Sequence, residues 1–402
     1  MKLRRPPTPP ILLLMLRLLF IITVCLPLYA LSLVIPRKQN IWVFGGFGGR
    51  LYADNSKALF SWMLENSCEH KRVYWITKRR DILRKLREEN KPCAHAYSIK
   101  GLFISLRASV FIYTHTSSDI NFWVSGGTRK INLWHGSALK KVLKDVDSSA
   151  SVERQIYSAT GLEKLCYRLL KPGYFESPDL IFAAADCVAK NLITSHGVSE
   201  NQISITGYPR TDVLFNPNDA LKAMYVKEGC NTVLYLPTFR EHDESDKSLY
   251  ELINSFSSRS EYLLLIKLHP ATFLGGTLDL PSNVVLLDQS VDTYEMMALS
   301  DVLITDYSSV ALDYLLLDRP IMYFCYDYAG YISNERGLYY DFNQVVGGPV
   351  IETSGALLAE LDEVLLVGVD HYKAKRHTVM RKFNHVVSKT NCANTYAAIE
   401  NF

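Results

Sequence analysis

Two histidines are the residues of this chain best suited to acid–base chemistry. His135 follows the apolar residues 131–134, and His269 follows the apolar residues 262–268, so each is predicted to stand at the carboxyl end of a strand. A histidine held at such a point, with Gly136 after it in the first case, is exposed and geometrically fixed, which suits a general base beside a cleft. A histidine that is hydrogen-bonded within a turn is the alternative for His135.

A serine-rich turn is the third chemical feature. Residues 301–324 read as strand, loop, helix and strand, and the loop Asp306-Tyr307-Ser308-Ser309 opens the helix. This order places two hydroxyls and free backbone N–H groups at a helix N-terminus just past a strand, where α/β folds hold phosphate. An ordinary capped helix is the alternative reading.

Glycine and basic residues in the first half could add phosphate contacts. Gly45–Gly49 contains four glycines around Phe47 and precedes Arg50, and Lys140 and Lys141 follow the His135 segment. Tight turns and a solvated helix face explain the same residues without a ligand. Residues 145–147 spell a DxD metal motif, but no strand precedes it, so we predict no metal site.

Strands alternating with helices must position these groups. The first half is predicted to contain strands at 41–44, 73–77, 110–114, 131–134, 180–183 and 203–206, and the second half at 232–236, 262–268, 284–287, 302–305 and 321–324. This alternation predicts parallel sheets that are covered on both faces. The fold class is therefore α/β, with two Rossmann-like domains that face a cleft, as in the glycosyltransferase-B architecture. One histidine would take a proton and the other would stabilise the phosphate left behind.

Composition restricts the class of protein. The 402 residues suffice for two domains, and 48% hydrophobic with 21% charged residues indicates a packed globular body. A net charge of +3 without a long basic run gives no reason to expect nucleic acid as a partner. The eight cysteines have neither CxxC spacing nor a partner histidine, which indicates reduced thiols.

The N-terminus is predicted to meet a membrane. Residues 11–35 are almost wholly apolar, long enough to span a bilayer or to lie at its surface with Arg17 snorkelling. A cleaved signal peptide is the alternative, but the apolar stretch is longer than usual, so we favour a retained anchor. The basic residues before it favour an external body, whereas the function argued below needs a cytoplasmic one. The predicted divisions are a membrane segment (1–38), two Rossmann-like domains (39–215 and 216–370) and a helical tail (371–402).

Five motifs carry a family resemblance. They are WHGSALKK at 134–141, PTFR at 237–240, KLHP at 267–270, TDYSSVALDYLLLDRPI at 305–321 and RGLYYDF at 336–342. In order and approximate spacing they resemble the CDP-glycerol glycerophosphotransferase family, which primes or polymerises teichoic acid and related capsule polymers. The resemblance runs from about residue 41 to the C-terminus. The family more often has threonine and proline where this chain has Ser137 and Ala138.

The resemblance implies a membrane-associated transferase. It would move glycerol phosphate, or ribitol phosphate, from a CDP-alditol to a lipid-linked saccharide or polymer and release CMP, without a metal or other cofactor. It implies a location at the cytoplasmic (inner) membrane with the body on the cytoplasmic side. The absence of the long extensions of many polymerases favours single addition.

The resemblance also assigns site residues. His135 matches the general base, and His269 matches the histidine at the donor phosphates. The donor-binding candidates are Arg240, Lys267, Thr305, Asp306, Ser308 and Ser309; the candidates for acceptor or phosphate contacts are Gly136, Ser137, Lys141 and Arg50.

Two other functions compete with this one. A sugar-nucleotide glycosyltransferase of the same fold would share the cleft and the histidines, and the nucleotide that supports turnover separates the two. A catalytically silent membrane scaffold is the second alternative, but it would be expected to have lost cleft residues, whereas His135 and His269 are both present.

Overall fold

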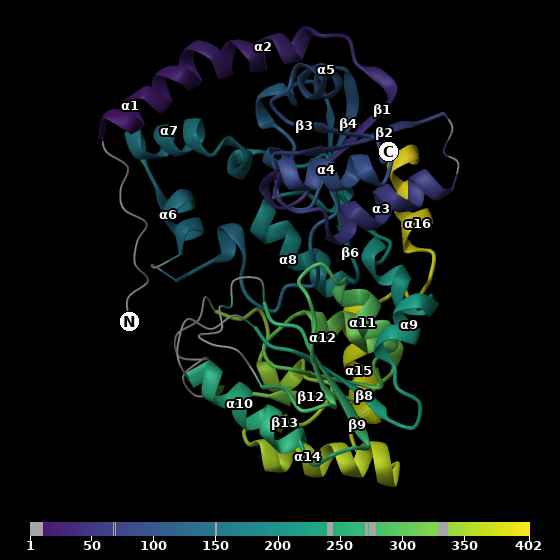
Figure 1. Ribbon diagram of the computed structural model, residues 1–402. Coiled ribbons are helices and arrows are strands. Elements are labelled where there is room, and N and C mark those ends of the chain that lie inside the picture. Colours follow the sequence, from purple (N-terminus) through teal and green to yellow (C-terminus); the bar gives the residue numbers. More distant parts are fainter. Residues whose placement is uncertain are drawn as a thin grey trace. The chain divides into compact units, whose positions relative to one another are not determined.

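The computed structural model describes residues 11–66, 68, 70–148, 151–238, 244–269, 272, 279–328 and 337–402. The chain divides into two compact units (Figure 1). Unit 1 comprises Met1–His135, Lys141–Arg210 and Thr390–Phe402, and unit 2 comprises Gly136–Lys140 and Thr211–Lys389. Each unit contains one parallel sheet, so the predicted pair of parallel α/β units is confirmed.

Unit 1 has seven strands in the order β3-β2-β1-β4-β5-β6-β7. They are β1 (Lys38–Phe44), β2 (Arg72–Thr77), β3 (Cys93–His95), β4 (Ala108–Tyr113), β5 (Arg129–Asn132), β6 (Leu180–Ala183) and β7 (Ile203–Ile205). Its helices after the N-terminal segment are α3 (Asp54–Glu65), α4 (Arg80–Glu88), α5 (Ile99–Arg107), α6 (Val152–Ser158), α7 (Gly161–Leu170), α8 (Asp186–His196) and α16 (Asn391–Asn401). The C-terminal helix α16 thus belongs to unit 1, where it packs on α3 (Figure 1).

Residues of β1 show why this sheet forms. Trp42 and Phe44 lie in one buried cluster, while Ile41 and Val43 lie in another. Because successive strand side chains point to opposite faces, both faces of the sheet are covered, as an apolar run without alternation requires.

Unit 2 has six strands in the order β10-β9-β8-β11-β12-β13. They are β8 (Asn231–Leu236), β9 (Tyr262–Ile266), β10 (Val284–Leu286), β11 (Val302–Thr305), β12 (Ile321–Phe324) and β13 (Val350–Ile351). Its helices are α9 (Asp219–Tyr225), α10 (Glu244–Phe256), α11 (Thr293–Leu299), α12 (Val310–Tyr314), α14 (Ser354–Asp362) and α15 (Lys373–Phe383).

In both sheets the side on which the chain adds new strands changes at the first strand. The chain adds β2 and β3 on one side of β1 and then β4 on the other, and it adds β9 and β10 on one side of β8 and then β11 on the other. Ligands of open α/β sheets bind outside the strand carboxyl ends at such a switch point. The topology therefore directs attention to the loops after β1 and β4 in unit 1, and after β8 and β11 in unit 2.

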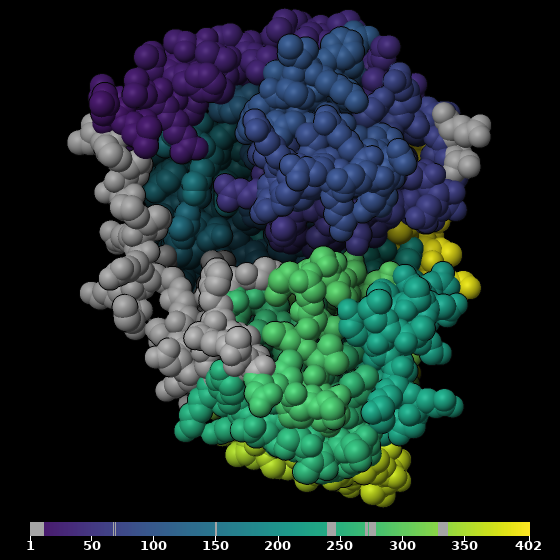
Figure 2. Space-filling model, viewed as in Figure 1, coloured from purple at the N-terminus to yellow at the C-terminus, as the bar shows by residue number. Residues whose placement is uncertain are grey.

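The N-terminal segment lies against unit 1. It runs through α1 (Ile11–Phe20), a π-helical turn (Ile21–Cys25) and α2 (Leu26–Val34), and Leu12–Val34 is long and apolar enough to cross a membrane by length and composition. Most of this stretch is exposed, as its place on the surface in Figure 2 shows. Its end is attached by stacking of Tyr29 on Phe122 and by the Arg37 guanidinium, which donates to the carbonyls of Ser105 and Gly126.

Candidate active site

His135 stands on a tight turn after β5. The strand ends at Asn132, so the predicted strand at 131–134 is wrong at its end. The Asn132 side chain accepts the Trp134 N–H (2.8 Å), and Trp134 has a left-handed backbone (φ 54°). A bulky residue rarely adopts this conformation, and such strain costs on the order of 1–3 kcal/mol. The Asn55 amide compensates by donating to the carbonyl of Trp134 (2.9 Å), so His135 leaves the sheet in a fixed direction.

Both histidines have the same spacing from their strands. His135 is three residues after Asn132, and His269 is three residues after Ile266, where β9 ends. The predicted strand at 262–268 was therefore also too long. His269 is exposed in unit 2, beyond the carboxyl end of β9.

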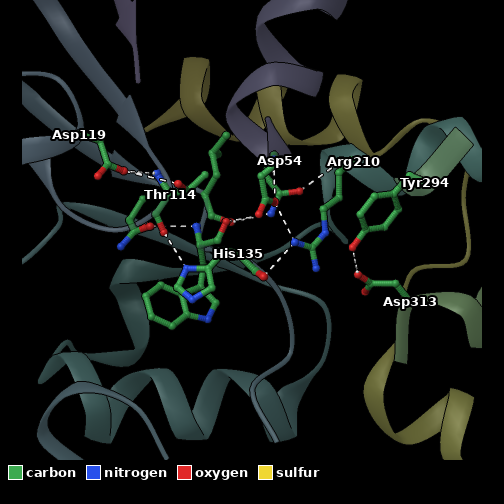
Figure 3. Close-up of polar contacts among 11 residues, drawn as sticks. Asp54, Thr114, Asp119, His135, Arg210, Tyr294 and Asp313 are labelled. Carbon is green, nitrogen blue, oxygen red and sulfur yellow. Dashed lines mark hydrogen bonds and ion pairs between the residues drawn. The ribbon is translucent and has the colours of Figure 1, made fainter. Parts of the chain in front are cut away.

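The ring of His135 is held in one tautomer. Its Nδ1 lies 3.1 Å from the carbonyl oxygen of Thr114 (Figure 3). A carbonyl can only accept, so Nδ1 carries the hydrogen and Nε2 is the nitrogen that can take a proton. Burial lowers the pKa of His135 to about 4, although Asp54 and the Thr114 carbonyl act in the opposite direction. The ring is therefore neutral near pH 7, as a general base must be.

A buried ion pair supports the same turn. The Arg210 guanidinium donates to Asp54 Oδ1 and to the carbonyl of His135, both at 2.8 Å (Figure 3). The backbone N–H of Arg210 donates to the Asn55 side chain (3.1 Å). Asp54 and Arg210 are about nine-tenths buried. Local sequence patterns give these residues no role, because 155 positions separate Arg210 from Asn55 in the chain.

Asp119 organises the switch point of unit 1. Its buried carboxylate accepts the backbone N–H groups of Gly48 (2.7 Å), Thr114 (3.1 Å) and His115 (2.9 Å). A Cβ on Gly49 would lie 2.8 Å from the Asp119 carbonyl, and Gly49 has φ +79°. The glycine-rich loop is therefore needed for close approach to Asp119, and it leaves Arg50 exposed at its end.

The residues after His135 are divided between the two units. Gly136 has φ 120°, and residues 136–140 belong to unit 2, where the carbonyl of Leu139 accepts the Tyr339 N–H (2.9 Å). Ser137 lies within this segment. Lys141 returns to unit 1 and pairs with Asp147 Oδ2 at 2.7 Å.

The switch point of unit 2 is held by Asp306. Its carboxylate, 2% exposed, accepts the Thr238 N–H (3.0 Å) and the Thr238 hydroxyl (2.9 Å), which joins the loops after β8 and β11. The buried Thr305 hydroxyl donates to the carbonyl of Leu236 (2.7 Å). Asp306, the first residue of the predicted turn, and Thr305, the residue before it, therefore both fix the course of the loop after β11.

Lys267, Ser308 and Ser309 all follow the carboxyl ends of strands in the sheet of unit 2, Lys267 after β9 and the serines after β11. Lys267 Nζ donates to the carbonyls of Asp288 (3.1 Å) and Gln289 (3.3 Å), and burial lowers its pKa. Ser309 precedes α12 but makes no side-chain cap bond, and the Ser308 hydroxyl accepts the Val310 N–H only at 3.4 Å. The serine hydroxyls therefore do not serve as ordinary helix caps. Arg240 lies outside the described residues, as does Arg336 of the last motif.

The DxD residues have other contacts. Asp145 accepts the Thr194 hydroxyl (2.5 Å) and Asp147 pairs with Lys141. Within the described ranges, no group of three or more histidine, cysteine, aspartate or glutamate side chains could hold a metal ion.

Comparisons with known proteins define the class and then the family. The family model for CDP-glycerol:poly(glycerophosphate) glycerophosphotransferase matches residues 27–401. The chain therefore belongs to this glycerophosphotransferase family.

Individual relatives have low sequence identity to this chain but align with most of its length. The teichoic acid poly(glycerol phosphate) polymerase of Bacillus subtilis (strain 168) is 27% identical over 84% of this chain, and the chain spans only 45% of that protein. The teichoic acid glycerol-phosphate transferase of Staphylococcus aureus is 27% identical over 82% of this chain and 85% of its own length.

Solved structures support the fold. The wall teichoic acid polymerase TagF aligns with a TM-score of 0.73 and 21% identity, over 97% of each chain. The calicheamicin glycosyltransferase CalG4 aligns with a TM-score of 0.51 and 12% identity over 90% of this chain and 98% of its own.

Proposed function

We propose that this protein transfers glycerol phosphate, or ribitol phosphate, from a CDP-alditol to a hydroxyl of a lipid-linked saccharide or polymer and releases CMP. The observation that carries the proposal is the state of His135, whose Nδ1 faces the Thr114 carbonyl and whose pKa is lowered to about 4. This geometry supplies a neutral, oriented base in a chain of the glycerophosphotransferase family.

The reaction conserves atoms and charge in one displacement. The acceptor hydroxyl oxygen forms a bond to the phosphorus that carries the alditol, and its proton passes to His135 Nε2. The bond between that phosphorus and the bridging oxygen of the diphosphate breaks, and CMP leaves with the electron pair. Trp134, Asn55 and Arg210 act as positioning residues, because they hold the His135 turn and not the reacting atoms.

The donor is proposed to bind at the switch point of unit 2. His269, Lys267 and Arg240 would meet the charge that develops on the departing CMP, together with the turn Thr305–Ser309. Asp306 would act by fixing the turn, since Thr238 occupies its carboxylate. The two units would face each other in the glycosyltransferase-B manner. The reaction would require neither a metal nor another cofactor.

The membrane completes the proposal. The apolar helix at Leu12–Val34 would attach the protein to the cytoplasmic membrane, with the body on the cytoplasmic side. Gly136, Ser137, Lys141 and Arg50 would contact the acceptor or its phosphates. A sugar-nucleotide glycosyltransferase is the second candidate, because CalG4 shares the fold.

CMP release tests the proposal. Purified protein in detergent is offered CDP-glycerol, CDP-ribitol and nucleotide sugars, each with a lipid-linked acceptor extract. We expect CMP from a CDP-alditol and a loss of about 10²- to 10⁴-fold in His135→Ala, the usual contribution of a general base. Near-wild-type turnover in that variant would exclude His135 as the base, and turnover only with a nucleotide sugar would establish the second candidate.

A further inference from the structure

The N-terminal helix (Leu12–Val34) is docked on unit 1 through one face only. Its buried and half-buried positions recur at alternating steps of four and three residues, with Tyr29 beside this row. They are Leu14, Leu18, Ile21, Cys25, Leu28 and Ser32. Positions with this spacing lie on one side of a helix, so the side that faces unit 1 is the same along most of its length.

Specific contacts hold the docked face. Leu28 packs against the buried cluster that contains Ala96 and Ile104, and the fully buried Ser32 accepts the Gly126 N–H through its hydroxyl oxygen (2.9 Å). A Cβ on Gly126 would collide with the Ser32 side chain, so the helix and this turn of unit 1 are in close contact. The second half of the N-terminal helix is therefore part of the folded body.

A docked helix is too short to cross a bilayer. Its first fully buried position is Ile21, and the described residues before it form α1 (Ile11–Phe20), a helix of 10 residues. At 1.5 Å per residue α1 is about 15 Å long, half of the roughly 30 Å of a hydrocarbon core. To span, the helix would have to leave unit 1 and break the bond between Ser32 and Gly126.

The face turned away from unit 1 is apolar and exposed. Four leucines recur on it every seven residues and are 39–69% exposed: Leu12, Leu19, Leu26 and Leu33. Helix α5, which runs beside α2 (Figure 1), adds Ile99 and Phe103, 89% and 65% exposed. A helix at a membrane surface normally turns a polar face to water. Here unit 1 covers that face, so only the apolar face needs a partner.

The charge around this face fits an anionic lipid surface. The first 53 residues contain seven lysine or arginine residues and no aspartate or glutamate, and residues 90–118, which include α5, also lack acidic residues. Among them, Arg17, Lys38 and Lys100 are exposed. Anionic headgroups attract such residues, whereas a second copy of this chain would bring like charges together. Charge therefore favours lipid over self-association.

We propose that the N-terminal helix lies in the plane of an anionic membrane surface and does not cross the bilayer. Its exposed face and the side chains of Ile99 and Phe103 are embedded together, while unit 1 covers the other face. The inference specifies the membrane attachment proposed above. A helix that does not cross puts no demand on the side of its flanks, so the basic residues before it do not conflict with a cytoplasmic body.

Depth measurements on spin labels test the proposal. The full chain, with its four half-buried cysteines changed to serine, is bound to vesicles of phosphatidylglycerol and phosphatidylethanolamine. Single nitroxides are attached in Leu12→Cys, Leu19→Cys, Leu26→Cys and Leu33→Cys, and depth is read from collisions with oxygen and with a water-soluble nickel complex. We expect one shallow depth at all four positions. A spanning helix would change the depth by about 10 Å at each step of seven residues.

Two further labels test the part played by α5. Phe103→Cys should place its label at the same depth as the four helix labels. Arg84→Cys is the control, because it is exposed on α4 (Arg80–Glu88), which packs on the opposite face of the sheet, and its label should remain in water. A water-exposed label at Phe103 would exclude α5 from the embedded face.

Three results would overturn the in-plane helix. Steps of about 10 Å along the four leucine positions would establish a spanning helix. Dipolar broadening between labelled copies would show that a second chain covers the face, and failure to bind the vesicles would exclude lipid as the partner. None of these measurements uses CDP-glycerol, so the in-plane helix can be confirmed even if the protein releases no CMP and the transfer proposal fails.

Discussion

The pH dependence of the transfer reaction follows from the environment of His135. The perturbation is acidification, and the group that responds is an imidazole whose pKa burial lowers from 6.5 to about 4. A lowered pKa means that the base remains neutral, and therefore competent, well below the ordinary range of histidine. At pH 5.5 about 97% of the rings are then neutral, compared with about 9% for a ring of ordinary pKa, a difference of roughly tenfold.

The assay is kcat/KM for CDP-glycerol, because this quantity reports the free enzyme's ionisations. We expect it to stay nearly level from about pH 8 to pH 5 and to fall with an apparent pKa near 4. Asp54 raises the pKa of His135, so Asp54→Asn should move the acid limb to still lower pH. Protein recovered at pH 7 after each acid incubation must regain full activity, which controls for unfolding.

An acid limb near pH 6.5 would refute the reasoning, because it would mean that His135 is solvated like a free imidazole. The residual activity of His135→Ala provides a second check. If that activity shows the same acid limb as the wild type, then a different group carries the ionisation.

The other predictions concern the groups around the two histidines and the serine turn. Arg210→Ala should lower the free energy of unfolding by about 3–5 kcal/mol in urea titrations, since it leaves Asp54 buried without its partner; an unchanged midpoint would contradict the ion pair. Asp119→Ala removes the acceptor of three backbone N–H groups and should cost at least about 1–3 kcal/mol in the same assay. The folded-state pKa of His196, about 3, lies below its unfolded value, so the unfolded state binds more protons between those values and stability falls with acidification below pH 6.5. This contribution is about 2 kcal/mol between pH 7 and pH 5 and should vanish in His196→Gln, as calorimetry at both pH values can show. Ser309→Ala should raise the KM for CDP-glycerol with little change in stability, because the hydroxyl makes no cap bond; a loss near 1 kcal/mol with unchanged KM would instead indicate a capping role.

Tertiary structure decided contacts that local patterns do not encode. Nothing near Asp54 or Arg210 in the chain indicates that they pair, and the glycine-rich loop after β1 proved to fit closely around Asp119. Such long-range contacts depend on which strands become neighbours, and that order emerges only when the sheet assembles. The strand containing Ile131 was wrongly predicted to run to Trp134, because Leu133 and Trp134 are apolar. Apolar residues indicate burial, but a side-chain bond from Asn132 turned the chain out of the sheet two residues earlier.

The alternation of strands and helices, the two parallel sheets and the family could be predicted from the sequence, because apolar runs and ordered motifs are properties of the chain. The sequence also predicted His135 and His269 directly after strands, and in the structure each follows its strand, β5 or β9, by three residues. Only the folded structure decided the tautomer and pKa of His135, because both depend on the Thr114 carbonyl and on burial by residues distant in the chain.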